Sequence, residues 1–338
     1  MAIGGPATAV LRSFARIAKV AGSEQEARTA AARAGAAFRS LFNQPDSTAA
    51  VRVASSDDDY WKQCLDYSAS VGLQATLDEY LHLLMSELGL DGKSETDRLE
   101  RLAERIAAVV GLRRAAVGAH HIHVRHGAMK RDSKRFRSRF AMRFGEERRD
   151  ESDQSLRADD VRAAFNSPFG PFVLATTSVG QEGLDFHFYC HSVVHWNLPS
   201  NPVDLEQREG RVHRFKGLAV RKNVLRHYAD AAIQANGTDP WEVAFEQATL
   251  ARAESENDLI PYWVYPIDDG ASIDRYVPAL PLSRDIERHG ALRASLALYR
   301  MVFGQPRQEE LVSYLANVLG PEHIQAVGDS LRISLEPS

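Results

Sequence analysis

The chain has 338 residues, of which 44% are hydrophobic and 25% are charged, and its formal net charge at pH 7 is −4. This composition is typical of a globular protein with more than one domain, and it excludes wholesale disorder and an overall basic surface, so any nucleic-acid-binding surface must be a local patch. The two cysteines exclude a disulfide framework, and the lack of an apolar run of about 18 residues excludes a membrane span. The N-terminal residues lack the pattern of a secretory signal, and we therefore expect a cytoplasmic protein.

The first part of the chain is predicted to be helical. Alanine and leucine dominate residues 6–110, apolar residues recur at intervals of three and four, and the segment 27–37 is rich in alanine. Residues 61–90 predict a helix, a glycine break and a long amphipathic helix. Residues 95–112 predict a further helix, whose apolar stripe contains Leu99, Leu102, Ile106 and Val109 or Val110.

The hydrophobic pattern of the sequence changes at residue 113, from a helical period to the alternation of strands. Residues 116–126 and 136–144 alternate in the way that strands do, and residues 145–160 form a charged segment that is expected to be a solvated loop. Residues 111–149 hold twelve Lys or Arg against three Asp or Glu, and three phenylalanines lie among them: Phe136, Phe140 and Phe144. Contact with a nucleic-acid backbone and a simple solvated strand face both explain this basic region. No metal site is expected, because the nearby histidines lack partner ligands at a suitable spacing.

A parallel sheet is expected in the middle of the chain. A short helix closed by Asn166 precedes two apolar runs, 171–177 and 191–199, which we interpret as buried strands. Buried strands joined by a helix predict an α/β fold. The chain is expected to become mostly helical again after about residue 225, with helices at 221–234, 240–254 and 282–303 and an irregular aromatic stretch at 259–267.

A cluster of arginines follows the second apolar run, in "LEQREGRVHR" (205–214). Asn201 can cap a helix here, Pro202 suits its first position, and Asp204 lies near its positive end. On that helix, the positions i, i+4 and i+7 place Gln207, Arg211 and Arg214 on one face. Guanidinium groups fork onto phosphate oxygens, so this face suits a phosphate. The alternative is an exposed basic helix that forms ion pairs with Glu206 and Glu209.

Two motifs in this region resemble those of a known family. The first, in "TSVGQEGLDF", contains Thr177, Gly183, Leu184 and Asp185, and the second contains Gln207, Arg208, Gly210, Arg211 and Arg214. Their order, their spacing and the intervening "VVHWNLPSNP" resemble the C-terminal RecA-like lobe of superfamily 2 helicases and translocases over residues 158–217. Gln207 points to the Swi/Snf-like and DExH-like branches, and "LEQREGRVHR" is especially similar to the bacterial RNA-polymerase-associated Swi/Snf-like ATPases.

The resemblance implies a role for each matched residue. Arg211 and Arg214 would act as arginine fingers, and Gln207 would face the nucleotide. Gly183 and Asp185 would line the cleft between two lobes, although Asp185 could also be a carboxylate that caps a turn. The residues that would contact nucleic acid are Thr177, Ser178 and Arg208.

The N-terminal lobe of that family, which binds the phosphates of ATP, has no counterpart in the sequence. "GKS" at Gly92–Ser94 lacks the required glycine, because position 87 is Glu87, and it joins two predicted helices. "DEYLH" (78–82) has its histidine one position too late for a DExH box and lies within a predicted helix. The resemblance therefore implies the second half of a motor, with ATP and Mg²⁺ held by a separate N-terminal lobe in cis or in trans, in either a fragment or a split gene.

The sequence thus predicts an α/β fold in which a RecA-like parallel-sheet lobe (113–225) lies between a helical insertion or linker (1–112) and a mostly helical C-terminal extension (226–338). The predicted function is that of the C-terminal lobe of an ATP-dependent helicase or translocase that acts on nucleic acid, with DNA preferred over RNA and no membrane partner. The alternative hypothesis is a non-catalytic module that binds nucleic acid or a partner protein.

Overall fold

The computed structural model describes residues 4–20, 25–55, 57–111, 115–125, 128–138, 158–175, 185–234, 238–253, 257–278 and 283–301, with a few residues between 310 and 323. The described residues form two compact units. The first unit draws on residues 1–182 and 228–247, and the second draws on residues 183–227 and 248–338. The domain boundaries expected from the sequence remain a prediction.

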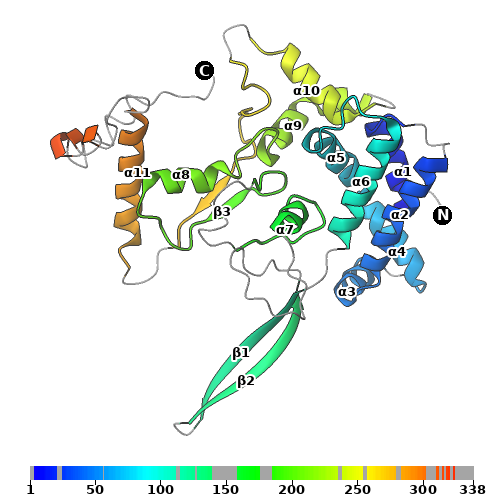
Figure 1. Ribbon diagram of the computed structural model, residues 1–338, viewed down its shortest axis with the longest axis horizontal. Helices are drawn as coiled ribbons and strands as arrows, with labels where there is room; N and C mark the ends of the chain where they lie inside the picture. Colours follow the sequence, from blue (N-terminus) through cyan, green and yellow to red (C-terminus); the bar gives the residue numbers. More distant parts are fainter. Residues whose placement is uncertain are drawn as a thin grey trace. The chain divides into compact units, whose positions relative to one another are not determined.

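Helices fill the first part of the first unit, as the sequence predicts. In chain order they are α1 (Pro6–Ile17), α2 (Gln25–Phe42), α3 (Pro45–Ala54), α4 (Tyr60–Ser70), α5 (Leu73–Glu87) and α6 (Glu95–Val110) (Figure 1). The predicted glycine break is Gly72, which adopts a left-handed conformation (φ 67°) between α4 and α5. A side chain is strained in this conformation, so glycine is the residue that lets the second helix start in a new direction.

The core of the first unit lies where α1, α2, α5 and α6 pack together. The predicted stripe on α6 is confirmed, because all of its apolar residues are buried: Leu99, Leu102, Ile106, Val109 and Val110. Burying each such side chain contributes about 1.5–3 kcal/mol. Gly35 on α2 permits a close approach of α1, since a Cβ at this position would lie 2.6 Å from the Cβ of Ala7.

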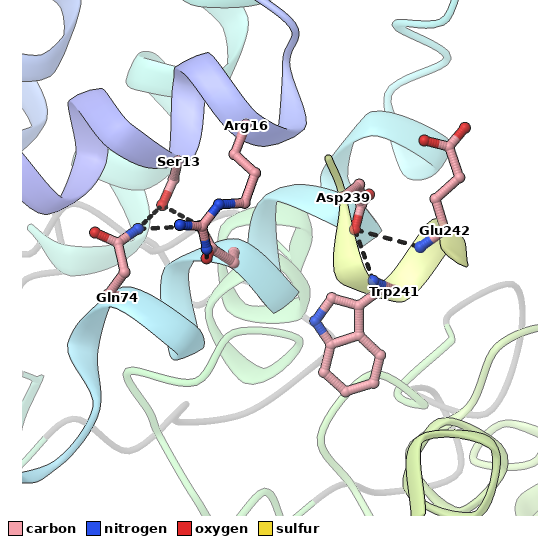
Figure 2. A network of polar contacts seen from close by, with 7 residues as sticks. Ser13, Arg16, Gln74, Asp239, Trp241 and Glu242 are labelled. Atoms are coloured by element: carbon pink, nitrogen blue, oxygen red, sulfur yellow. Dashed lines mark hydrogen bonds and ion pairs between the residues drawn. The ribbon is translucent and has the colours of Figure 1, made fainter. Parts of the chain in front are cut away.

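Polar side chains join some of these helices as well. Ser13 on α1 donates a hydrogen bond to Oδ1 of Asp78 on α5 (2.6 Å), and the amide of Gln74 donates to both groups (Figure 2). Arg16 forms an ion pair with the same carboxylate. Asp78 is buried, so these donors compensate the loss of its hydration and fix the register of α1 against α5.

A long antiparallel pair of strands follows α6. Strand β1 (Ala115–Arg125) pairs with β2 (Ala128–Ser138), from Ala115 opposite Ser138 to Arg125 opposite Ala128. The strand predicted at 116–126 is thereby confirmed, and only residues 136–138 of the second predicted strand lie within the described residues. Helix α7 (Ala158–Phe165) confirms the predicted short helix that Asn166 closes. The rest of the predicted charged loop, 145–157, lies outside the described residues.

The second unit contains a small parallel sheet. Strand β3 (Ser192–Val194) pairs with β4 (Asp274–Tyr276), and helix α8 (Pro202–Gly210) follows β3. Leu198 and Leu205 form a buried cluster with Leu292 on α11 (Asp285–Met301). Helices α9 (Leu218–Gln234) and α10 (Pro240–Leu250) confirm two predicted helices, and each contributes residues to both units.

The two predicted buried strands are only partly present. Residues 171–175 form no strand, and Phe172 and Val173 are 81% and 70% exposed, so the prediction of a buried strand is wrong for this described part of 171–177. A parallel strand needs a neighbour, and in the described residues the parallel pairing joins β3 only to β4. The strand predicted within 191–199 exists as β3, but Val194 at its end is 57% exposed, so this strand is not buried as predicted.

The described elements are mostly helical and include a small parallel sheet, which is consistent with a RecA-like lobe. None of the helices in the described part of the chain is long and apolar enough to cross a membrane.

Candidate functional site

Helix α8 begins as the sequence predicts. The Oδ1 atom of Asn201 accepts a hydrogen bond from the backbone N–H of Val203 (2.8 Å), Pro202 occupies the first turn, and Asp204 lies in that turn as well. These features satisfy free N–H groups and complement the positive end of the helix. Leu205 is completely buried, so one side of the helix is fixed to the core while Gln207 remains exposed.

The end of α8 differs from the prediction. The helix ends at Gly210, Arg211 is its C-cap residue, and Arg214 lies beyond it. The backbone N–H groups of Val212 and His213 both donate to the carbonyl of Glu209 (3.0 and 3.2 Å), which tightens the last turn and redirects the chain. The prediction that Gln207, Arg211 and Arg214 share one helix face is therefore wrong, because Arg214 belongs to the turn 211–217.

This turn packs directly against the residues that follow the first motif. The backbone N–H of Phe186 donates to the carbonyl of Arg211 (2.9 Å), and that of Leu218 donates to the carbonyl of His187 (3.1 Å). The Nε atom of Arg214 lies 3.0 Å from Oδ1 of Asp185 in an ion pair. The structure thus brings together residues of the two predicted motifs that are 25 or more positions apart in the sequence.

The ion pair between Asp185 and Arg214 joins two partly exposed side chains, although the Nε atom that faces Asp185 is itself buried. The two side chains are 41% and 43% exposed. Exposed ion pairs stabilise proteins by about 0.2–1 kcal/mol, because water screens their charges and two flexible side chains must be ordered. The pair therefore contributes little to the stability of the fold.

Arg221 on α9 forms hydrogen bonds that stabilise the turn 211–217. Its side chain is completely buried, its Nη1 donates to the carbonyl of Lys216 (2.6 Å), and its Nη2 donates to the carbonyl of Phe188 (2.6 Å). Its guanidinium also lies 5.4 Å from the centre of the Tyr189 ring. One residue of α9 therefore connects both segments of the site. In the sequence it is an ordinary basic residue of a helix, so it carries no signal of this role.

Glu209 joins α8 to both strands of the parallel sheet. Its Oε1 lies 3.1 Å from Nε2 of His195, which directly follows β3, and its Oε2 accepts a short hydrogen bond from Arg275 on β4. Burial acts to raise the pKa of Glu209, but the hydrogen bonds and charges of His195 and Arg275 outweigh it and hold this pKa below its ordinary value. From the sequence alone, Glu209 is only a possible ion-pair partner within the helix. Its contact with Arg275 spans 66 positions, and no local pattern signals it.

Aromatic side chains from residues 259–267 pack against the turn 211–217. The ring of Phe215 stacks on Tyr262 with centroids 5.5 Å apart and contacts Trp263 edge-on at 6.2 Å. The Lys216 N–H donates to the carbonyl of Tyr262 (2.7 Å). The irregular aromatic stretch predicted at 259–267 therefore holds the arginine-bearing turn in place.

The structure also describes two further residues of the second motif, Arg208 and Gly210. Arg208 donates through Nη1 to the carbonyl of Asn197 (2.8 Å), which ties α8 to the loop after β3. Gly210 has open space around it, since a Cβ there would meet no atom within 4 Å. Three other predicted site residues lie outside the described residues: Thr177, Ser178 and Gly183.

The segments "DEYLH" and "GKS", which do not match nucleotide-binding motifs, have structural roles. In "DEYLH", Asp78 is engaged by α1, and Nδ1 of His82 lies 2.5 Å from Oδ2 of Asp239. The Oδ1 atom of Asp239 accepts the N–H of Trp241 at the start of α10 (Figure 2). In "GKS", Ser94 caps α6 by accepting the N–H of Asp97 (3.2 Å). Across the described segments, no group of three or more His, Cys, Asp or Glu residues is placed to hold a metal ion.

Comparisons with known proteins agree with the location of this site. The family "Helicase conserved C-terminal domain" matches residues 149–216. A segment of 43 residues, 13% of the chain, is 48% identical to the uncharacterized ATP-dependent helicase YqhH of Bacillus subtilis (strain 168), and it spans 8% of that protein's length. No solved structure matches the chain significantly. The sequence matches therefore support a helicase C-terminal lobe in the part of the chain that carries Asp185, Arg211 and Arg214.

Proposed function

We propose that the chain supplies the C-terminal lobe of an ATP-dependent helicase or DNA translocase of the Swi/Snf-like branch. The observation that carries this proposal is the contact between the segment 185–188 and the turn 211–217, which gathers Asp185, Arg211 and Arg214 in one place. Two motifs that resemble helicase motifs in sequence are thus also neighbours in space. The helicase match over residues 149–216 covers both of them.

In this proposal the chemistry takes place on a nucleotide that another lobe holds. That lobe would bind the phosphates of ATP and Mg²⁺, and Arg211 and Arg214 would approach the terminal phosphate as its charge develops during transfer to water. Arginines in this role are typically worth about 10³–10⁵ in rate. The exposed Gln207 would face the same nucleotide, and Gly183 would line the cleft between the lobes.

Asp185 would control Arg214 in the absence of ATP. Its carboxylate holds the guanidinium close to the turn, and the exposure of both groups makes the pair weak enough to exchange for phosphate. Contacts with the nucleic-acid backbone would come from Thr177, Ser178 and Arg208. For Arg208, this contact would compete with its present bond to Asn197.

The experiment combines the full chain with its matching N-terminal lobe and measures ATP hydrolysis with and without DNA. Each protein alone should be nearly inactive, and the mixture should hydrolyse ATP. Arg211→Ala should abolish that activity, while Lys222→Ala, which removes an exposed charge from α9, should leave it unchanged. Strong DNA-stimulated hydrolysis by the isolated chain would contradict the proposal. Binding of DNA without any hydrolysis in the mixture would favour the non-catalytic interaction module instead.

A further inference from the structure

The two-stranded ribbon β1–β2 has no role in the proposed ATP chemistry. Each strand has 11 residues, and the strands pair with each other along their whole length (Figure 1). Among the described elements, the two strands make their extensive contacts with each other. The sequence of the ribbon is therefore free to serve a ligand.

The register divides the ribbon into two faces, because directly paired residues share a face and the faces alternate along each strand. One face contains three arginines of β2, and we call it the arginine face. The three pairs are Arg131 with Ile122, Arg135 with Gly118, and Arg137 with Ala116. The opposite face contains Arg125, Lys130 and Lys134. It also contains the acidic residue Asp132, whereas the arginine face has no acidic residue in either strand.

The charge of the ribbon is opposite to that of the chain. The two strands contain six basic residues and one acidic residue, in a chain with 41 Lys and Arg against 45 Asp and Glu. Charges that only keep a surface in solution are normally of both signs, whereas a concentration of one sign attracts a partner of the other sign. Of the two interpretations of this region, the excess of basic charge therefore favours binding of a polyanion over a simple solvated face.

The spacing of the arginines suits a nucleic-acid backbone. Strands rise about 3.3 Å per residue, so Arg131 and Arg137 are about 20 Å apart along the ribbon, which equals about six base pairs of duplex DNA. The major groove of B-form DNA is about 12 Å wide and accepts a two-stranded ribbon, while the deep and narrow major groove of duplex RNA does not. The shape of the ribbon therefore favours duplex DNA.

The end of the ribbon carries an exposed apolar pair. Val124 and Met129 are directly opposite each other on the arginine face, one pair before the last pair of the ribbon, and they are 69% and 74% exposed. Exposed apolar side chains beside arginines are used to contact base edges or to enter base steps.

We propose that the ribbon β1–β2 is a duplex-DNA-binding arm. Its arginine face lies along the phosphates, and Val124 and Met129 contact the bases. This binding requires neither ATP nor a second lobe, so it does not depend on the role proposed for Arg211 and Arg214.

The test measures the affinity of the full chain for a short mixed-sequence duplex DNA by fluorescence anisotropy, without nucleotide and over a series of salt concentrations. The triple variant R131Q/R135Q/R137Q is compared with R125Q/K130Q/K134Q, which removes the same charge from the opposite face. Loss of three phosphate contacts should lower the slope of log affinity against log salt by about 2.7. We expect this change, and an affinity at least tenfold lower, for the first variant and a clearly smaller effect for the second.

A second variant, V124S/M129S, should weaken binding while the salt slope stays the same. Equal losses in the two triple variants, or no loss in either, would overturn the assignment of the arginine face. Tighter binding of duplex RNA or of single-stranded DNA than of duplex DNA would overturn the choice of ligand. Circular dichroism of each variant confirms that the chain is folded. Failure of the ATPase experiment would leave these measurements unaffected, so the two proposals can fail separately.

Discussion

Replacing Glu209 by glutamine removes the carboxylate that joins α8 to both strands of the parallel sheet. The side chains of Glu209 and His195 are 24% and 1% exposed, so their hydrogen bond is shielded from water, whereas Arg275 is 39% exposed. A hydrogen bond to a charged group contributes about 1.5–3 kcal/mol when it is buried. The more exposed contact with Arg275 contributes less, about 1 kcal/mol.

Together these contacts predict that Glu209→Gln weakens the second unit by about 2–4 kcal/mol, which corresponds to an increase of about 30- to 1000-fold in the population of locally opened molecules. The direction of the pH dependence follows from the lowered pKa of Glu209. A group of this kind stabilises the folded state above its unfolded pKa of about 4.3, and the stabilisation is lost as the pH falls through the folded pKa. The difference between wild type and variant should therefore be full at pH 7 and should disappear in acid.

Amide hydrogen exchange measured by mass spectrometry on the full chain is the suitable assay, because it reports local opening in a protein with two units. Peptides that cover β3 and the segment 205–213 should exchange faster in Glu209→Gln, while peptides from α5 and α6 should not change. Glu246→Gln, which neutralises an exposed carboxylate on α10, is the matched control. A change of less than about threefold in the second unit would show that the carboxylate is not what holds α8 to the sheet.

Three glycines give further predictions that thermal unfolding of the full chain can check. Gly35→Ala should lower Tm, because the new Cβ would lie 2.6 Å from the Cβ and 3.0 Å from the Cα of Ala7, and overpacking of this kind costs about 1–3 kcal/mol. An unchanged Tm would mean that α1 and α2 can separate freely. Gly290→Ala on α11 should raise stability by about 0.5–1 kcal/mol, because its Cβ would meet nothing within 4 Å in a helix. Gly210→Ala should likewise leave Tm unchanged or higher, and a fall in Tm would contradict the open space around this residue.

The helices could be predicted from the sequence because their determinants are local. The stripe on α6 repeats at the helical period, and the caps Ser94 and Asn201 precede the first turns of their helices. The apolar run at 171–175 carries an equally clear local signal, yet it forms no strand, because a parallel strand depends on partners that are distant in the sequence.

In the candidate site, too, the features set by local sequence could be predicted, and those set by distant residues could not. The motifs that contain Asp185, Arg211 and Arg214 could be identified through the resemblance to helicases, and the structure places these residues together. The end of α8 was predicted incorrectly, because the competing hydrogen bonds to the carbonyl of Glu209 leave no trace in the helical pattern. The supporting contacts of Glu209 and Arg221 could not be predicted, since each joins segments that are far apart in the chain.

The pairing of Arg214 with Asp185 bears directly on whether these arginines are available to a nucleotide. A buried ion pair would hold Arg214 permanently, because breaking such a pair costs about 3–5 kcal/mol. The observed pair is more than 40% exposed on both sides, which places it among pairs worth about 1 kcal/mol or less. A phosphate offers a higher charge than a carboxylate and several oxygens in the geometry of the guanidinium fork. Under the proposed function, this contact would keep Arg214 at the turn 211–217 without nucleotide and would release it when the second lobe presents ATP.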